Sequence, residues 1–110
     1  MAETFGQFIK RNRLACGLTL QRLSDLSDLS ITFISRLERD DLSPPGEEKL
    51  KKLAHIFKMD EEDMIFKAER VPSNISQMMI DRPDIVPILR LGSKKTPEEV
   101  RALISKMYNE

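Results

Sequence analysis

Cysteine and histidine are scarce in this sequence: its 110 residues include one of each, Cys16 and His55. A single cysteine cannot form an intrachain disulfide, and one cysteine with one histidine falls short of the four ligands that a structural zinc site uses. A disulfide-stabilised secreted domain and a zinc module are therefore both excluded. An unpaired thiol is typical of the cytoplasm, and we expect no bound metal.

Long apolar segments and glycine-rich segments are also missing. No apolar run approaches the roughly 18 residues of a membrane-spanning helix, and the opening stretch MAETFGQFIKRNR lacks the apolar middle and cleavage site of a signal peptide. With four glycines in all, the chain has no glycine-rich loop to hold a nucleotide phosphate. We predict a cytoplasmic protein that needs no cofactor and does not enter a membrane.

An excess of basic charge is absent as well. The chain has 18 Lys and Arg against 18 Asp and Glu, with a pI of about 6.6, whereas dedicated nucleic-acid binders often carry a strongly basic balance. Residues 1–66 have ten basic against twelve acidic side chains, a net charge of −2, and residues 67–110 have eight against six, a net charge of +2. The overall charge therefore does not point to DNA. With 40% hydrophobic and 33% charged residues, the composition fits one small folded domain with a short appendage.

The first helix has clear signals at both ends. Thr4 followed by Gln7 makes a capping box, in which each side chain binds the other residue's backbone N–H. Gly17 is the usual kind of residue after a helix end. These signals predict a helix from about Phe5 to Cys16.

Four more helices are predicted before residue 69. Thr19 and Ser30 cap the next two, Pro44–Pro45 ends the third, a fourth runs from about Glu47 to Lys58, and Asp60 caps a short fifth. No stretch alternates as a half-buried strand does, so we predict an all-α fold. The apolar positions expected to face the core are Phe8, Ile9, Leu20, Leu23, Leu26, Ile34, Leu37, Leu50, Leu53, Ala54, Phe57, Met64, Ile65 and Ala68.

After residue 70, prolines interrupt the chain and short helices are predicted between them. Ser73 is expected to cap one helix and Asp84 a second. Pro87 is tolerated in the second because it lies in the first turn, and Gly92 ends that helix.

The last helix is the best specified in the chain. Thr96 is its N-cap, Pro97 its first residue, and Glu99 completes a capping box. A lone helix of this length is marginal in water, so its apolar stripe needs either the rest of the chain or a second copy to pack against. The stripe consists of Val100, Leu103, Ile104, Met107 and Tyr108.

The order and spacing of these features resemble the XRE-like transcriptional regulators, whose helix-turn-helix domain is of the phage repressor and Cro type. The resemblance spans Thr4 to about Phe66. It implies a five-helix DNA-binding domain over residues 1–68 and a helical extension over residues 69–110, which would serve dimerisation or partner binding. Its carriers are Gly6, Ile9, Arg13, Gly17–Leu23, Leu29–Ser30, Ile34–Arg39, Pro45 and the segments LKKLAHIFKM and DMI.

The resemblance implies a structural ion pair. In this family an arginine of the first helix commonly pairs with a glutamate near the end of the recognition helix, and Arg13 and Glu38 occupy those places. Pairing is favoured over direct DNA contact for both residues, because a buried unpaired charge would cost on the order of 3 kcal/mol.

The resemblance also implies how DNA would be read. The recognition helix, about residues 30–39, would lie in the major groove and the second helix would bridge the backbone. Phe33 is expected to pack on the scaffold instead. The residues expected to face bases are Ile31, Thr32, Ser35 and Arg36, and those expected to hold phosphates are Thr19, Gln21, Ser30, Arg39 and Lys10.

Four residues depart from the family's pattern. Ser24 stands where alanine is usual, and Asp28 where the turn usually has glycine, although Asp adopts the left-handed conformation more readily than most residues. Asp40 and Asp41 follow the recognition helix where glycine and a basic residue are common, and both would stand close to phosphate. One protomer should therefore bind weakly, while paired half-sites would recover the affinity. Lys10, Arg11, Arg36 and Arg39 could still form a basic face.

The leading hypothesis is a sequence-specific DNA-binding regulator, a repressor acting as a homodimer on double-stranded DNA. The alternative is an antitoxin or protein-binding adaptor that uses the helix-turn-helix as a scaffold and holds a protein partner through its C-terminal helices. An enzyme is not predicted. Cys16 and His55 show no orienting group, and the pairs Glu47–Glu48 and Glu61–Glu62 lie in helix first turns, where the helix dipole explains them.

Overall fold

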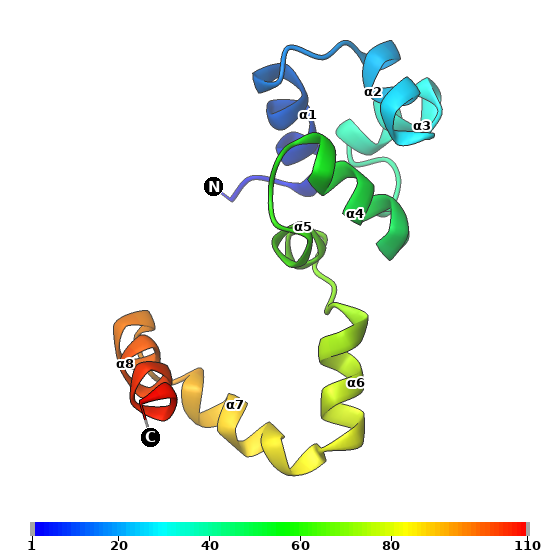
Figure 1. Ribbon diagram of the computed structural model, residues 1–110. Coiled ribbons are helices and arrows are strands. Elements are labelled where there is room, and N and C mark those ends of the chain that lie inside the picture. The colour runs from blue at the N-terminus through cyan, green and yellow to red at the C-terminus, as the bar shows by residue number, and fades with distance from the viewer. Residues whose placement is uncertain (1, 110) are drawn as a thin grey trace. The chain divides into compact units, whose positions relative to one another are not determined.

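The computed structural model describes residues 2–109, and all the regular elements in that range are helices, which confirms the all-α prediction (Figure 1). The chain divides into two compact units, Met1–Pro72 and Ser73–Glu110. No helix in the described range is long and apolar enough to cross a membrane. The elements are α1 (Phe5–Ala15), α2 (Leu20–Ser27), α3 (Ile31–Glu38), α4 (Glu47–Ile56), α5 (Glu61–Lys67), α6 (Ser73–Asp81), the 3-10 turn η1 (Pro83–Ile85), α7 (Val86–Gly92) and α8 (Pro97–Tyr108).

The first unit is a bundle of five helices around one apolar core. Its main packing contacts join α4 to α5, α1 to α3, and α2 to both α3 and α4. Burying each large apolar side chain favours folding by about 1.5–3 kcal/mol. The core consists of Phe8, Ile9, Leu23, Ile34, Leu37, Leu50, Leu53, Ala54, Phe57, Met64, Ile65 and Ala68, with Phe5, Leu18, Leu20, Leu29, Phe33, Ile56 and Met59 packed partly against it.

The predicted apolar stripe of α2 was wrong at one position, because Leu26 remains 37% exposed. Ile31 is 39% exposed, as a residue predicted to face bases must be. Three residues turn a helix by about 300°, so a stripe at spacing three drifts away from the core with each step. Ser27, four residues after Leu23, stays on the buried face instead, and its hydroxyl accepts a hydrogen bond from the Leu29 N–H at 3.2 Å.

Local capping places the helix starts in this unit as the sequence predicts. Thr4 and Gln7 form both hydrogen bonds of the capping box at α1. The side chains of Thr19, Ser30 and Asp60 each accept a hydrogen bond from the backbone N–H three residues later, at 3.0–3.1 Å. These bonds satisfy N–H groups that a helix start would otherwise leave unpaired.

The second unit contains α6, η1, α7 and α8. Thr96 and Glu99 form the predicted capping box of α8. The predicted cap at Asp84 was wrong: α7 begins at Val86 without a side-chain cap. Because Pro83 starts a 3-10 turn, Asp84 lies inside that turn and its Oδ1 accepts from the Arg82 Nε at 2.8 Å. This hydrogen bond lowers the pKa of Asp84.

Candidate nucleic-acid interface

The turn between α2 and α3 is held by backbone geometry and by a side chain. Asp28 has φ 60° and ψ 20°, the left-handed conformation, which confirms that an aspartate accommodates this turn. The Ser24 hydroxyl donates to the Leu29 carbonyl at 2.5 Å across the turn. The Ser24 hydroxyl therefore links the end of α2 to the residue just before the N-cap of α3.

Asp28 is also tied to α4, which sequence reasoning missed. Its carboxylate forms an ion pair with Lys52 and accepts a hydrogen bond from the Lys52 ammonium group. This hydrogen bond lowers the pKa of Asp28. The two side chains are 24 positions apart, so no local pattern in the sequence links them. The pair joins the helix-turn-helix to the helix behind it.

The recognition helix, α3, has one face in the core and one face in solvent. Ile34 and Leu37 are 1% exposed, while Ile31, Thr32 and Arg36 are exposed. Ser35 is partly exposed, and Phe33 packs against the core as predicted. The structure thus brings the four proposed base-reading residues onto the outer side of one rigid helix.

Arg13 and Glu38 form a two-pronged ion pair between α1 and the end of α3. Arg13 Nε and Nη2 donate to the two Glu38 carboxylate oxygens at 2.7 and 3.1 Å, and the two side chains are 9% and 6% exposed. Arg13 Nη1 also donates to the Leu18 carbonyl at 2.9 Å. The hydrogen bond to Glu38 raises the pKa of Arg13. Glu38, the one acid of α3, is therefore neutralised inside the protein and does not face solvent as a free charge.

Asp40 has a structural use that the sequence did not reveal. It adopts a left-handed φ of 61°, a conformation that glycine adopts without strain and that aspartate adopts more readily than most residues. Its carboxylate accepts from the Gly6 N–H at 2.9 Å and from the Thr4 hydroxyl at 2.6 Å. Asp40 thus caps the N-terminus of α1, where the helix dipole favours negative charge.

Gly6 is required by the close approach of α1 to the end of α3. A Cβ atom on Gly6 would lie 2.5 Å from the Leu37 carbonyl oxygen and 2.7 Å from both the Glu38 carbonyl oxygen and Asp40 Oδ1. Two of these three atoms are backbone, so they cannot move aside cheaply. The contact therefore leaves no room for a Cβ atom at this position.

The proposed phosphate-binding residues lie on α1, on α2 and at both ends of α3. The Thr19 and Ser30 hydroxyls sit at the first turns of α2 and α3, beside backbone N–H groups that favour anions. Lys10 lies four residues after Gly6 and three before Arg13, so it projects from the same side of α1 as these two buried residues. The Lys10 side chain itself is exposed.

Two arginines of the predicted basic face, Arg39 and Arg11, have acidic neighbours. Arg39 Nε lies 3.4 Å from Asp41 Oδ2, and both side chains are exposed, so solvent screens the pair strongly. Arg11 donates to Glu3 at 2.7 and 3.0 Å, which lowers the pKa of Glu3. Gln21, the remaining proposed phosphate contact, donates through Nε2 to Asp25 at 2.9 Å.

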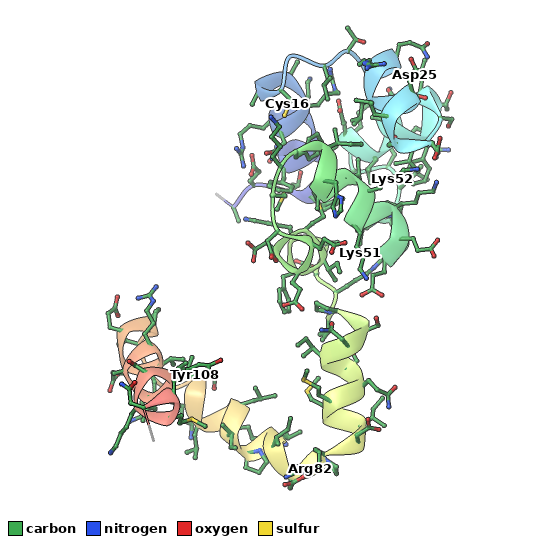
Figure 2. All side chains as sticks on the ribbon, viewed as in Figure 1. Cys16, Asp25, Lys51, Lys52, Arg82 and Tyr108 are labelled. Atoms are coloured by element: carbon green, nitrogen blue, oxygen red, sulfur yellow. The ribbon has the colours of Figure 1, made fainter. Side chains whose placement is uncertain are left out.

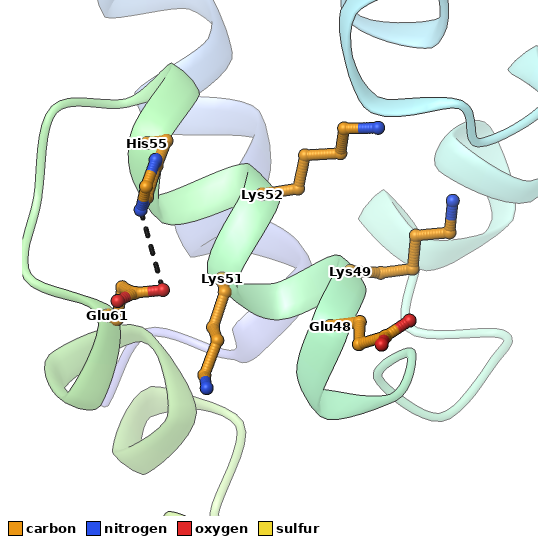
Figure 3. A pocket seen from close by; sticks show the side chains of 6 residues that line it. All are labelled: Glu48, Lys49, Lys51, Lys52, His55 and Glu61. Carbon is orange, nitrogen blue, oxygen red and sulfur yellow. Dashed lines mark ion pairs between the residues drawn. The ribbon is translucent and has the colours of Figure 1, made fainter.

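A shallow hollow of about 340 Å³ lies on the outer face of α4 (Figure 3). It is lined by Lys49, Lys51, Lys52, Glu48, His55 and Glu61, and His55 Nε2 lies 3.4 Å from Glu61 Oε2. Cys16 lines a different hollow, next to Leu18, so the structure does not bring the two candidate catalytic groups together. No cluster of three metal-ligating side chains occurs in the described part of the chain.

A family model described as helix-turn-helix matches residues 9–64, just over half of the chain. The protein belongs to the helix-turn-helix family. The matched segment runs from within α1 into α5 and includes the whole α2–turn–α3 unit. This match confirms the resemblance to XRE-type regulators and makes the protein a DNA-binding helix-turn-helix regulator. No curated protein and no solved structure matches the chain.

Proposed function

We propose that this helix-turn-helix protein is a sequence-specific repressor that binds double-stranded DNA as a homodimer, with α3 of each copy in the major groove. The observation that supports this most strongly is the two-sided character of α3. Ile34 and Leu37 lock one side into the core, and the Arg13–Glu38 pair fixes its end. The outer side is free to enter a groove.

Each outward residue of α3 has a contact that its chemistry supports. Arg36 can donate two parallel hydrogen bonds to a guanine, a contact worth about 1–3 kcal/mol of discrimination. Thr32 and Ser35 can hydrogen-bond a base edge, and the Thr32 methyl or Ile31 can contact a thymine methyl. These contacts would select the sequence.

The phosphate contacts come from residues around α3. Thr19, Gln21 and Ser30 offer polar side chains and helix N-terminal N–H groups, and Lys10 and Arg39 offer positive charge. The acids nearest α3 oppose phosphate binding less than the sequence alone indicates, because Glu38 is paired with Arg13 and Asp40 caps α1. Asp41 and Arg39 lie together in solvent.

Tight binding to DNA nevertheless requires two copies. Residues 1–66 carry a net charge of −2, and phosphate neutralisation supplies most of the affinity of such proteins. When two copies are joined, the second contact becomes intramolecular and gains a high effective concentration. A dimer covering a promoter blocks access to it without any further contact, which is why repression is the outcome we propose.

The test begins with duplexes selected by the protein from a random-sequence pool. In a gel-shift titration at several salt concentrations, wild type should retain a selected duplex better than a scrambled one. Arg36→Ala should reduce this preference by about 10-fold or more, because each copy loses a guanine contact. Arg101→Ala on α8 is the matched control, since it removes the same charge from an exposed helix position.

A selected duplex should also lose affinity steeply with salt. Equal retention of selected and scrambled duplexes would contradict sequence-specific reading. No retention even at low salt would contradict DNA binding altogether and favour the adaptor or antitoxin hypothesis.

A further inference from the structure

The three helices α6, α7 and α8 bury none of their side chains within the described residues. Nine of the fourteen exposed large hydrophobic residues in that range belong to this second unit, although it is about half the size of the first. A segment of fewer than about 40 residues seldom holds a fold without a disulfide, a metal or association. The unit contains no cysteine, and its described part has no metal-ligating cluster.

The exposed apolar surface is continuous along one side of α8. Leu103 is 54% exposed, Ile104 47% and Met107 75%, and Tyr108, labelled in Figure 2, is 87% exposed. The capping box and Pro97 define where this helix begins, so its stripe has a fixed register. A helix of this length gains most of its stability from packing its apolar face.

We propose that Ser73–Glu110 is a self-association unit, whose helices pack against the same helices of a second copy of this chain. This deepens the proposed function, since it names the surface that joins the two DNA-binding units. Association and the tertiary packing of these helices occur together, because each chain alone has no core in this segment.

The apolar area supports a second copy as the occupant. The nine side chains expose on the order of 1,000 Å² in one chain, and a stable interface buries about 800 Å² per partner. The first unit offers five exposed large hydrophobics in its described residues, and one of these, Ile31, lies on the outer face of α3. The surface that best matches the second unit in area is therefore another second unit.

Charge also supports a second copy. Residues 73–110 contain six basic and five acidic side chains, so two copies do not repel each other as a whole. Glu98 and Glu99 lie in the first turn of α8 and Lys106 in the last. An antiparallel pair of α8 helices places the acidic turn of one copy beside the basic turn of the other and also opposes the helix dipoles favourably.

The stripe itself fits this antiparallel arrangement. Centred between positions 103 and 104, it places Leu103 of one copy opposite the partner's Ile104, and Val100 opposite the partner's Met107. Each contact then occurs twice, as a two-fold interface requires. Leu103 and Ile104 lie nearest the two-fold axis.

The test measures the mass of the full chain by sedimentation equilibrium over a range of concentrations, with circular dichroism on the same samples. Wild type should be dimeric and should lose helicity as it dissociates on dilution. Leu103→Asp should raise the dimer dissociation constant at least about 100-fold, because the symmetric interface loses the apolar contact twice. Ala102→Asp is the matched control, since it introduces the same charge at an exposed position on the opposite side of α8.

A cross-linking measurement keeps the proposal testable if Leu103→Asp also disturbs α8. In a Cys16→Ser background, mild oxidation by oxidised glutathione should link Leu103→Cys chains into dimers, while Ala102→Cys chains stay unlinked. A wild-type chain that is monomeric at every concentration would overturn the proposal, as would equal loss of dimer in Leu103→Asp and Ala102→Asp.

DNA binding distinguishes failure of this proposal from failure of the proposed function. A dimer with the variant pattern above that binds no DNA would support the association unit and contradict the repressor. A monomer that binds a selected duplex with sequence preference would contradict the association unit and the homodimer, and would support only the sequence-specific reading of DNA.

Discussion

The two units of this protein differ in whether their apolar side chains are buried or exposed. In Met1–Pro72, the large apolar side chains at helical spacing close into one core, with side chains such as Leu23 and Leu50 fully buried. In Ser73–Glu110, helices with equally clear signals bury no side chain among their described residues. Helix formation and core formation are therefore separate properties of a sequence. The first unit is a folded DNA-binding domain, and the second consists of helices whose apolar faces remain exposed.

The largest effect on the stability of the first unit is expected from removing the ion pair between α1 and the end of α3. Arg13→Ala should lower the free energy of unfolding by about 3–5 kcal/mol, because Glu38 is left buried without its partner. Urea denaturation followed by circular dichroism measures the change. Arg11→Ala, which removes an exposed arginine from the same helix, is the control and should leave the midpoint nearly unchanged. Equal effects of the two substitutions would contradict a structural role for Arg13.

A Cβ atom added at the close contact between α1 and α3 should have the next largest effect on the free energy of unfolding. Gly6→Ala places a Cβ against two backbone carbonyl oxygens and should cost about 1–3 kcal/mol in the same denaturation measurement. Gly92→Ala, at the end of α7, meets no atom within 4 Å and should have little effect on the first unit. A Gly6→Ala chain as stable as wild type would contradict the close contact between α1 and the end of α3.

Two substitutions of Asp40 should have a smaller effect on stability. Together they distinguish the capping role of this side chain from its charge. Asp40→Ala removes the acceptor for Gly6 and Thr4 and should destabilise the first unit by about 0.5–2 kcal/mol. Asp40→Asn keeps an acceptor oxygen, tolerates the left-handed backbone, and should retain most of that stability. If Asp40→Asn is as destabilising as Asp40→Ala, capping is not the role of this side chain.

The smallest expected effect concerns the exposed pair between Asp28 and Lys52. The pair lowers the pKa of Asp28 from its usual 3.8, so its contribution is present above pH 3.8 and is lost as pH falls through the lower folded-state value. Lys52→Ala should therefore lower the thermal midpoint slightly at neutral pH and have no effect well below pH 3.8. Lys51→Ala, on the same helix, is the control. A Lys52→Ala effect that is independent of pH would contradict the pairing.

Local signals in the sequence predicted the helix starts well. Thr4, Thr19, Ser30 and Thr96 all cap the helices they were expected to cap, because an N-cap bond joins residues three positions apart. The prediction failed at Asp84, where the preceding Arg82–Pro83 sequence favours a turn and offers the carboxylate a guanidinium.

Contacts between distant residues could not be predicted in the same way. Asp40 reaches Gly6 across 34 positions and Lys52 reaches Asp28 across 24. Only the packing of α1, α3 and α4 brings these groups together. The Arg13–Glu38 pair was expected solely because the sequence resembles a family, and the outer face of α3 was expected for the same reason. The periodicity could place Ile34 and Leu37 inside, but spacing three misplaced Leu26.

The most direct test of the account is a binding isotherm of the Leu103→Asp chain on a duplex selected by wild type, compared with a scrambled duplex. We expect this chain still to prefer the selected duplex, because the first unit reads DNA by itself, but to bind it more weakly and without cooperativity. Unchanged affinity would contradict a role of the second unit in association. Complete loss of sequence preference in a chain whose first unit remains folded would contradict DNA reading by the first unit alone.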